Sequence, residues 1–164
     1  MKGKLERVRS LLAIQTTLAL ATVDANSAPR STPLFYIADD ALRLYWFSSR
    51  SALHSLNLAR NPQASAAIFR QVESWRQIQG VQMQGSVAVV ADKKLRESVT
   101  KDYCERFQLG NLFALAIGRS ALYCFTPSFL SYIDNTRRFG YKFEIDLRQH
   151  ASTLCRKFST PVPS

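Results

Sequence analysis

The sequence predicts a mainly β fold, a closed antiparallel barrel of six or seven strands with α-helices at its periphery. Short extended runs recur along the chain and are joined mostly by polar turns, whereas only two or three segments have helical spacing. These helical segments do not alternate regularly with the strands, which excludes a βαβ architecture. A length of 164 residues and an apolar content of 46% indicate one domain with a real core.

The first part of the chain supplies two helices and three strands. The N-terminal helix is amphipathic, with apolar residues at helical spacing: Leu5, Val8, Leu11 and Leu12. Strands are expected at residues 18–23, 30–37 and 41–47, the second bent near Pro33. We expect residues 30–35 to pair with 41–47 in a three-stranded meander. A helix follows at 52–60 and is closed by Asn61-Pro62.

The second part of the chain continues the sheet. Further strands are expected at residues 65–69, 81–90, 121–133 and 141–145, with a long helix at 93–107 and a short helical turn at 113–117. Gly85 indicates a bulge, and Pro127 is expected to interrupt its strand. We therefore expect a single domain over residues 1–146 and a basic, flexible tail over 147–164.

Composition narrows the possible partners. The net charge of +10 comes from basic residues scattered along the chain, with no basic block and no helix-turn-helix pattern, so we expect an anionic small ligand rather than nucleic acid. Three widely spaced cysteines and two distant histidines predict reduced thiols and no metal site. With no apolar run that could cross a bilayer and no signal peptide, we expect a cytoplasmic protein.

The segment from Leu42 to Pro62 carries the strongest functional signal. A strand ends at Phe47, the turn Ser48-Ser49-Arg50-Ser51 follows, and a helix begins directly after it. This order brings hydroxyl groups, free backbone N–H groups and the positive end of a helix dipole to one point, which suits a phosphate group. The alternative interpretation is that Ser49 or Ser51 merely caps the helix.

Other residues could complete a site for a planar, amide-rich ring lying along the meander. Aromatic walls could come from Trp46, Trp75 and Phe139, although burial in the core or an interface explains each equally well. Side-chain donors could come from Gln79, Gln82 and Gln84, which could also be the solvent face of a strand. No nucleophile elbow, P-loop or Gly-x-Gly-x-x-Gly motif is present. Tyr103, Arg106 and Lys142 are the candidates for an acid or base.

Four ordered segments resemble the pyridoxamine 5′-phosphate oxidase-like FMN-binding split-barrel superfamily: Arg30–Tyr36 with its central Pro33, Leu44–Ser49, Leu56–Pro62 and Gly80–Gly85. Three segments resemble, more narrowly, a small, uncharacterised bacterial branch of this superfamily: Gly80–Gly85, Tyr103–Phe107 and Asp134–Lys142. The resemblance covers roughly residues 5–146. It implies a Greek-key split barrel that forms a homodimer, with an FMN in each of two clefts between the subunits.

The resemblance also implies which residues hold the flavin. The phosphate would lie at Ser48, Ser49 and His54, and the ring along the backbone of Ser31, Thr32, Pro33 and Leu34. Phe47, Gln82 and Asn135 complete the expected cofactor set, with Asn135 in a loop that could instead be a capped hairpin turn. His54 stands where many relatives carry a lysine, which predicts weaker or pH-dependent binding.

The C-terminal segment departs from the oxidases of the family. Residues 158–164 lack the arginine-bearing pattern that grips a substrate phosphate, so we do not expect vitamin B6 oxidation. The sequence thus predicts an FMN-dependent oxidoreductase that acts on an unidentified small molecule. Two alternatives stay open, a non-catalytic flavin or haem carrier or sensor on the same barrel, and a nucleic-acid-binding small barrel.

Overall fold

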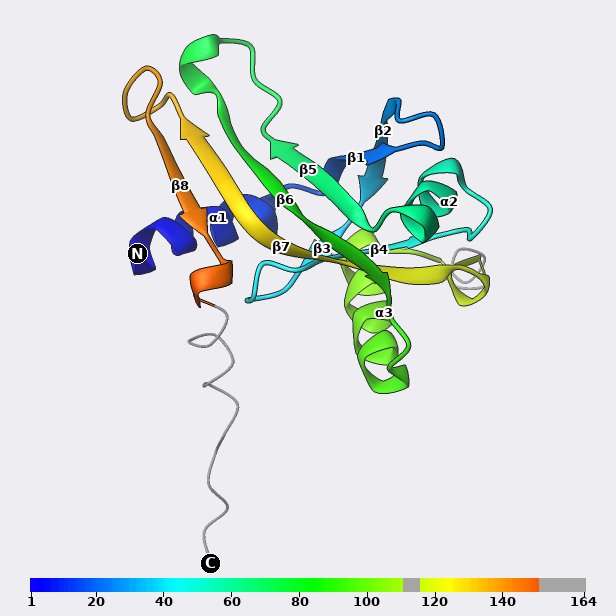
Figure 1. Cartoon of the computed structure of the whole chain (residues 1–164). Coiled ribbons are helices and arrows are strands. Elements are labelled where there is room, and N and C mark those ends of the chain that lie inside the picture. The colour runs from blue at the N-terminus through cyan, green and yellow to red at the C-terminus, as the bar shows by residue number, and fades with distance from the viewer. Residues whose placement is uncertain (111–115, 151–164) are drawn as a thin grey trace, which may run out of the picture.

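The computed structural model describes residues 1–110 and 116–150, which form one strongly curved antiparallel sheet with helices against it (Figure 1). The strands are β1 (Thr17–Val23), β2 (Pro29–Phe35), β3 (Ile37–Ala38), β4 (Leu44–Ser48), β5 (Gln63–Phe69), β6 (Gln79–Val89), β7 (Ala121–Asp134) and β8 (Lys142–Asp146). The helices are α1 (Lys2–Ile14), α2 (Leu53–Arg60) and α3 (Lys93–Phe107), with short 3₁₀ turns at Trp75–Gln77 and Arg148–His150. Residues 116–119 are also helical.

The strand order explains how the sheet closes. Along the sheet the order is β2-β1-β5-β6-β7-β4-β3, and β8 adds to β7 outside this path. The two ends of the path, β2 and β3, are separated in the chain by Tyr36 alone. One bent segment therefore supplies both edge strands and brings the two edges of the sheet near each other. β2 and β4 do not pair, and we call the gap between them the split. The mainly β split barrel predicted from the sequence is confirmed.

The predicted pairing of residues 30–35 with 41–47 is wrong. β2 pairs along its whole length with β1, and only Ile37 and Ala38 pair with β4, opposite Tyr45 and Leu44. Tyr36 turns the chain away from β1, because its side chain is buried and its N–H already donates to the carbonyl of Thr16. β4 also starts later than predicted, since Leu42 has a φ of 65° and belongs to the turn.

The longest strand pair, β6 with β7, has an irregularity at Gly85, as predicted, but the bulged strand is β7. Its register shifts between Gln84 and Gly85. Gly85 lies opposite Pro127, and a Cβ on Gly85 would collide with the backbone of Thr126. β7 nevertheless runs unbroken through Pro127, contrary to the predicted interruption, and β7 itself carries the extra residue: Gln84 pairs with Phe129 and Gly85 with Pro127, which leaves Ser128 without a pairing partner on β6.

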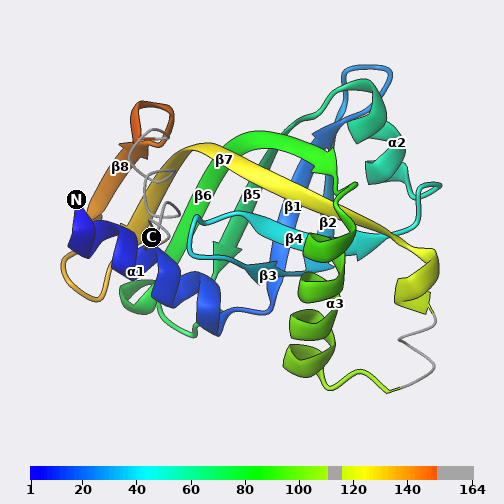
Figure 2. The ribbon, with the colours of Figure 1, turned by 90° about the horizontal axis from the view of Figure 1, so that it is seen from below.

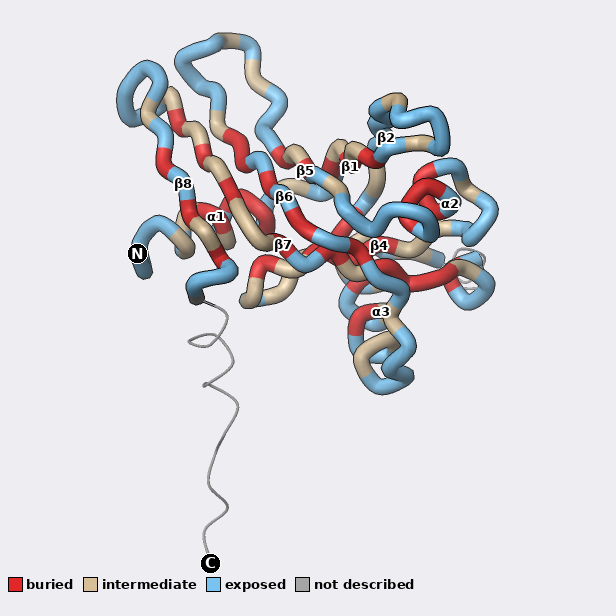
Figure 3. The backbone as a smooth tube through the Cα atoms, viewed as in Figure 1, coloured by how far each residue is buried: buried red, intermediate tan, exposed pale blue. Residues whose placement is uncertain are grey.

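Two apolar clusters hold the helices to the sheet. The larger one fills the barrel and includes Trp46, Met83 and Phe125, with α1 packed against it through Val8 and Leu12. The smaller one lies outside the barrel, where α3 packs on β3, β4 and β7. Figure 2 shows α1 and α3 on the side of β3 and β4, with α2 at the far end of β1. Burial follows the strand centres and leaves most loops exposed (Figure 3).

Beyond β8 the chain stays packed for a short distance. Leu147, the first residue of the predicted tail, is buried and its N–H donates to the carbonyl of Ser128. Residues 151–164 lie outside the described part of the chain, as do 111–115, on which most of the predicted turn 113–117 falls. Within the described residues, no helix is long and apolar enough to cross a membrane.

Candidate functional site

The turn between β4 and α2 leaves the start of the helix open. Ser49 and Ser51 bond to each other, with 2.8 Å between their Oγ atoms, and the N–H of Ser51 donates to Ser49 Oγ. The N-cap position is Ala52, which offers no side-chain acceptor to the first helical turn. Neither serine therefore caps α2. The first N–H groups and the positive dipole end of this eight-residue helix remain available to an anion.

His54 is positioned below this turn and is neutral. Its Nε2 lies 2.8 Å from Ser48 Oγ, and the residue is 7% exposed. Burial lowers the pKa of the imidazole below its ordinary value, so His54 carries no charge at pH 7. The groups that the turn could offer an anion are therefore hydroxyls and backbone N–H groups, with the exposed Arg50 as the nearest cation in sequence.

A buried polar contact fixes α2 against the sheet. Asn57 is fully buried, and its Nδ2 donates to Thr22 Oγ1 on β1 at 3.1 Å. Asn57 Oδ1 and Ser55 Oγ are buried without a hydrogen-bond partner within the described structure. Asn57 thus acts in the fold, by holding the helix that bears His54 at a set position relative to β1.

The segment expected to lie along a ring forms the open edge of β2. Ser31, Thr32, Pro33 and Leu34 belong to the most exposed strand of the barrel. β1 occupies one edge of this strand, and no described strand occupies the other edge, which faces the split. Backbone groups on this open edge can thus meet a ligand.

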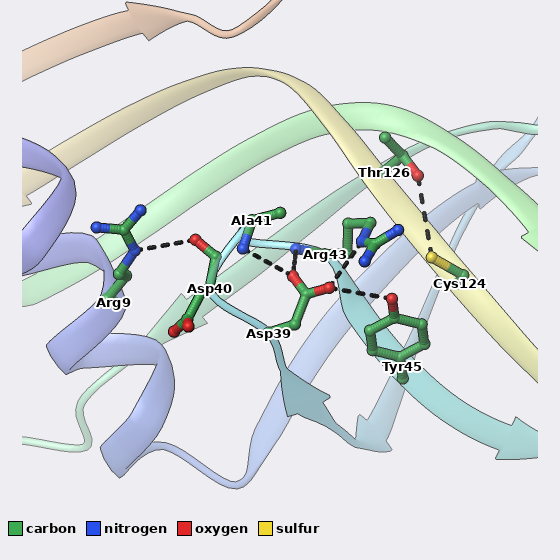
Figure 4. A network of polar contacts seen from close by, with 8 residues as sticks. All are labelled: Arg9, Asp39, Asp40, Ala41, Arg43, Tyr45, Cys124 and Thr126. Atoms are coloured by element: carbon green, nitrogen blue, oxygen red, sulfur yellow. Dashed lines mark hydrogen bonds and ion pairs between the residues drawn. The ribbon is translucent and has the colours of Figure 1, made fainter. Parts of the chain in front are cut away.

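A hydrogen-bonded turn places β4 on the other side of the split (Figure 4). The Asp39 carboxylate accepts bonds from the backbone N–H groups of Ala41 and Arg43, from Arg43 Nε at 2.7 Å and from Tyr45 Oη at 3.1 Å. Burial raises the pKa of the neighbouring Cys124 thiol, which therefore stays protonated at neutral pH. This network anchors β4 and carries no reactive group.

Gln82 and Ser31 are brought together on the outer face of the barrel. They line a shallow cavity of about 300 Å³ whose remaining walls are mostly small side chains of β1 and β5: Ala19, Ala21, Ser65 and Ala67. This cavity does not include the turn at Ser48–His54. Gln82 thus lies on the same face as the ring-binding segment rather than beside the candidate phosphate site.

Asn135 lies at the opposite end of the molecule from α2, as Figures 1 and 2 both show through the β7–β8 loop. Its side chain joins two loops, because Nδ2 donates to the carbonyl of Trp75 at 2.8 Å and Oδ1 accepts from the N–H of Gly140. Trp75 and Phe139 are exposed and meet edge to face at 5.1 Å. Within one chain, this loop does not reach the phosphate turn.

The remaining candidates have structural positions. Trp46 is fully buried and stacks on Tyr123, so it is a core residue rather than the wall of a site. Arg106 donates to the carbonyls of Ala13, in the last turn of α1, and of Gln15, its C-cap. Gln79 donates to Asp134 Oδ1, whereas Gln84 and Lys142 are exposed.

Tyr103 was a candidate acid or base, but the sequence did not indicate its contact with Phe35. Tyr103 on α3 donates its hydroxyl at 3.2 Å to the carbonyl of Phe35, the last residue of β2, which pairs with Thr17 of β1. Tyr103 and Phe35 line an apolar cavity beside the split. The helical stripe of Tyr103 and Phe107 signals a packed face, but only the fold shows that Phe35 and Phe47 complete it.

Comparison with known proteins identifies the family of this arrangement. A family model described as pyridoxamine 5′-phosphate oxidase matches residues 5–128. No curated protein matches the sequence.

Solved structures share the fold at low identity. A protein of Clostridium acetobutylicum, related to general stress protein 26 of Bacillus subtilis, has a TM-score of 0.68 at 14% identity, over 91% of this chain and 98% of the other. A haem-binding protein of Mycobacterium smegmatis has a TM-score of 0.73 at 16% identity, over 90% of this chain and 60% of its own. HutZ, the haem storage protein of Vibrio cholerae, has a TM-score of 0.63 at 20% identity, over 74% and 88%. At these identities the likeness concerns the fold alone.

Proposed function

The chain belongs to the pyridoxamine 5′-phosphate oxidase family, and from this premise we propose that it binds FMN and acts as an FMN-dependent oxidoreductase on a small molecule. The observation that carries the proposal is the uncapped start of α2. Three serine hydroxyls from the adjoining turn stand before a helix whose N-cap residue, Ala52, leaves the first N–H groups free. A phosphate monoester matches this donor set.

The proposed ring position follows from the split. If the phosphate binds at Ser48, Ser49 and His54, the open edge of β2 at Ser31–Leu34 runs along the other side of the same gap. Phe47 lies between these two regions as the last apolar residue of β4. When bound, the flavin supplies the hydride or electron chemistry, while the chain supplies binding, orientation and exclusion of water.

A homodimer would complete such a site. The outer barrel face around Ser31 and Gln82 consists mostly of small side chains, which allow a second sheet to approach closely. Asn135 lies too far along the barrel to serve the turn of its own chain, so we propose that Asn135 and Gln82 act on the flavin held by the other subunit. This arrangement places the flavin sites at the interface between subunits.

A haem carrier is the second candidate function, because two of the similar structures are described as haem-binding or haem-storage proteins. The described part of the site favours the flavin. His54 is buried and its Nε2 is bonded to Ser48, so this nitrogen is not open to an iron.

Absorbance of the purified protein and the mass of the ligand it releases test both candidates. Flavin bands and the mass of FMN support the proposal, whereas a Soret band would support haem. Titration with FMN and with riboflavin then isolates the phosphate contribution. We expect FMN to bind more tightly by at least about tenfold, or about 1.4 kcal/mol. Equal affinities would exclude the phosphate role of the turn, and failure to bind either flavin would exclude the function.

A further inference from the structure

An aromatic cavity adjoins the split on its α3 side. Its volume is about 320 Å³, within the usual range for a small-molecule pocket. The main side chains around it are Phe35, Phe47, Tyr103, Phe107, Leu109 and Ile117. We call this cavity the aromatic pocket. It is distinct from the cavity of Ser31 and Gln82 on the outer barrel face.

The rings of the aromatic pocket brace one another. The ring of Tyr103 packs edge-on to Phe47 at 5.2 Å and tilts against Phe107 at 4.7 Å. Phe107 in turn contacts Phe35 at 5.1 Å. Phe35 is nevertheless 56% exposed, which is unusual for a phenylalanine so closely surrounded by other rings. Its ring is thus held in place with much of its surface available for a further apolar contact.

The Tyr103 hydroxyl and the guanidinium groups of Arg96 and Arg106, beside the aromatic pocket, each donate to backbone carbonyls. The Tyr103 hydroxyl donates to Phe35 O, and burial raises its pKa to about 12, so it stays uncharged. Arg96 donates to the carbonyls of Ile117 and Ser120, at 3.2 and 2.8 Å, while its guanidinium lies over the Phe47 ring. Arg106 donates through Nη2 to carbonyls at the end of α1, while its guanidinium lies over the Phe107 ring and its buried Nε has no hydrogen-bond partner among the described residues. The α3 arginines beside the rings are therefore bonded to carbonyl groups rather than held ready for a phosphate or carboxylate.

The aromatic pocket is continuous in sequence with the proposed flavin site. Phe35 directly follows Leu34 of the ring-binding segment, and Phe47 directly precedes Ser48 of the phosphate turn. A molecule in this pocket would thus lie beside the gap in which the flavin is proposed to bind. The two regions differ in the charge of the ligand that they suit: the turn suits an anion, and the aromatic pocket suits an uncharged ligand.

We propose that the aromatic pocket binds a neutral, flat aromatic molecule and that this is the substrate class of the protein. The proposal that this pocket binds the substrate rests on the proposed flavin function. The proposal that it binds an aromatic molecule rests only on the rings and on the bonded arginines. Aromatic ligands favour such a site because offset and edge-to-face contacts add to the burial of apolar area. An anionic ligand would lose its hydration without gaining a free cation.

Two fluorescent probes with the same rings test the proposal. N-phenyl-1-naphthylamine is neutral, and its 8-sulfonate carries one negative charge. With the full chain we expect the neutral probe to bind more tightly by at least about tenfold. Equal or reversed affinities would overturn the assignment.

Variants at the rim of the aromatic pocket show where the probe binds and distinguish this binding from non-specific binding to apolar surface. Ala116 is exposed and lines the aromatic pocket, so Ala116→Phe fills the space without disturbing the core. We expect this variant to lose the neutral probe, and Ala116→Arg to shift preference towards the sulfonate. Ser98→Phe, which adds the same ring at an exposed position elsewhere on α3, serves as the control and keeps wild-type binding. Probe binding that survives Ala116→Phe would place the probe elsewhere.

The same samples separate this proposal from the flavin function. FMN affinity is measured on each variant, and Ala116→Phe is expected to leave it unchanged. Loss of the probe with retained FMN supports two adjacent sites. FMN binding without specific probe binding would overturn the aromatic pocket and leave the flavin function standing. Probe binding without FMN binding would overturn the substrate role and keep only the binding site.

Discussion

The two helices beside the split differ in the kind of surface they bring to it. α2 starts at an uncapped Ala52 and buries polar groups, namely His54, Ser55 and Asn57. α3 is capped by Asp92, which accepts from the N–H of Leu95, and it buries Val99 and Tyr103. One helix thus leaves its positive end uncapped, whereas the other presents rings beside two arginines, Arg96 and Arg106, that donate to backbone carbonyls. Two adjoining regions of one gap are thereby suited to chemically different ligands.

The largest expected effect is a loss of folding stability when the polar contact between α2 and β1 is removed. Asn57→Ala removes the donor to the buried Thr22 hydroxyl and leaves a cavity, which should lower the free energy of unfolding by about 2–3 kcal/mol. On α3, Tyr103→Phe removes one hydroxyl bond but keeps the ring, and should cost only about 1 kcal/mol. Urea denaturation measures both. Equal losses would contradict the difference between the two helices.

A side-chain cap at the start of α2 should weaken FMN binding and make the fold more stable. In Ala52→Asp, a carboxylate occupies the position at which the phosphate is proposed to bind, so we expect FMN affinity to fall by about tenfold or more. The same change should stabilise the fold by up to about 1 kcal/mol. Asp92→Ala is the matched variant on α3, and it should lose about 1 kcal/mol without altering FMN affinity. Unchanged FMN affinity in Ala52→Asp would place the phosphate elsewhere.

A cation at residue 54 should strengthen the proposed binding of an anion at the turn. His54 is neutral and bonded to Ser48, whereas a lysine can extend its ammonium to the surface. We expect His54→Lys to tighten FMN binding by about fivefold, or about 1 kcal/mol, with no change for riboflavin. His54→Gln retains a polar side chain without charge and serves as the control. Equal tightening of riboflavin would assign the gain to packing rather than to phosphate.

The smallest effect is a pH dependence of stability. Burial lowers the pKa of folded His54, so between its ordinary value of about 6.5 and the lower folded value the unfolded chain binds more protons. The contribution of His54 is complete above about pH 6.5 and decreases as the pH falls through that window. Unfolding free energies at pH 7.5 and 5.5 should therefore differ more for the wild type than for His54→Gln. Parallel pH profiles would show that His54 does not contribute.

Local chemistry made much of the fold predictable. Strand periodicity, the turn residues and the spacing of α1, α2 and α3 depend on neighbours within a few positions, and Gly85 indicated the irregularity between β6 and β7 because no other residue fits so close to a facing backbone. The strand–turn–helix of Ser48–His54 was visible for the same reason. Its resemblance to a family rested on the order of several such segments.

Only the tertiary structure decided which segments meet. The sequence showed two neighbouring strands but could not show that β2 leaves β4 for β1, because strand pairing depends on distant partners and on the buried turn at Tyr36. That single choice creates the split, exposes the edge at Ser31–Leu34 and brings Phe35 to Tyr103. By itself, the sequence determined the barrel class and the strand–turn–helix at which we propose that an anion binds. The long-range packing of α3 determined that an uncharged aromatic pocket lies beside that turn.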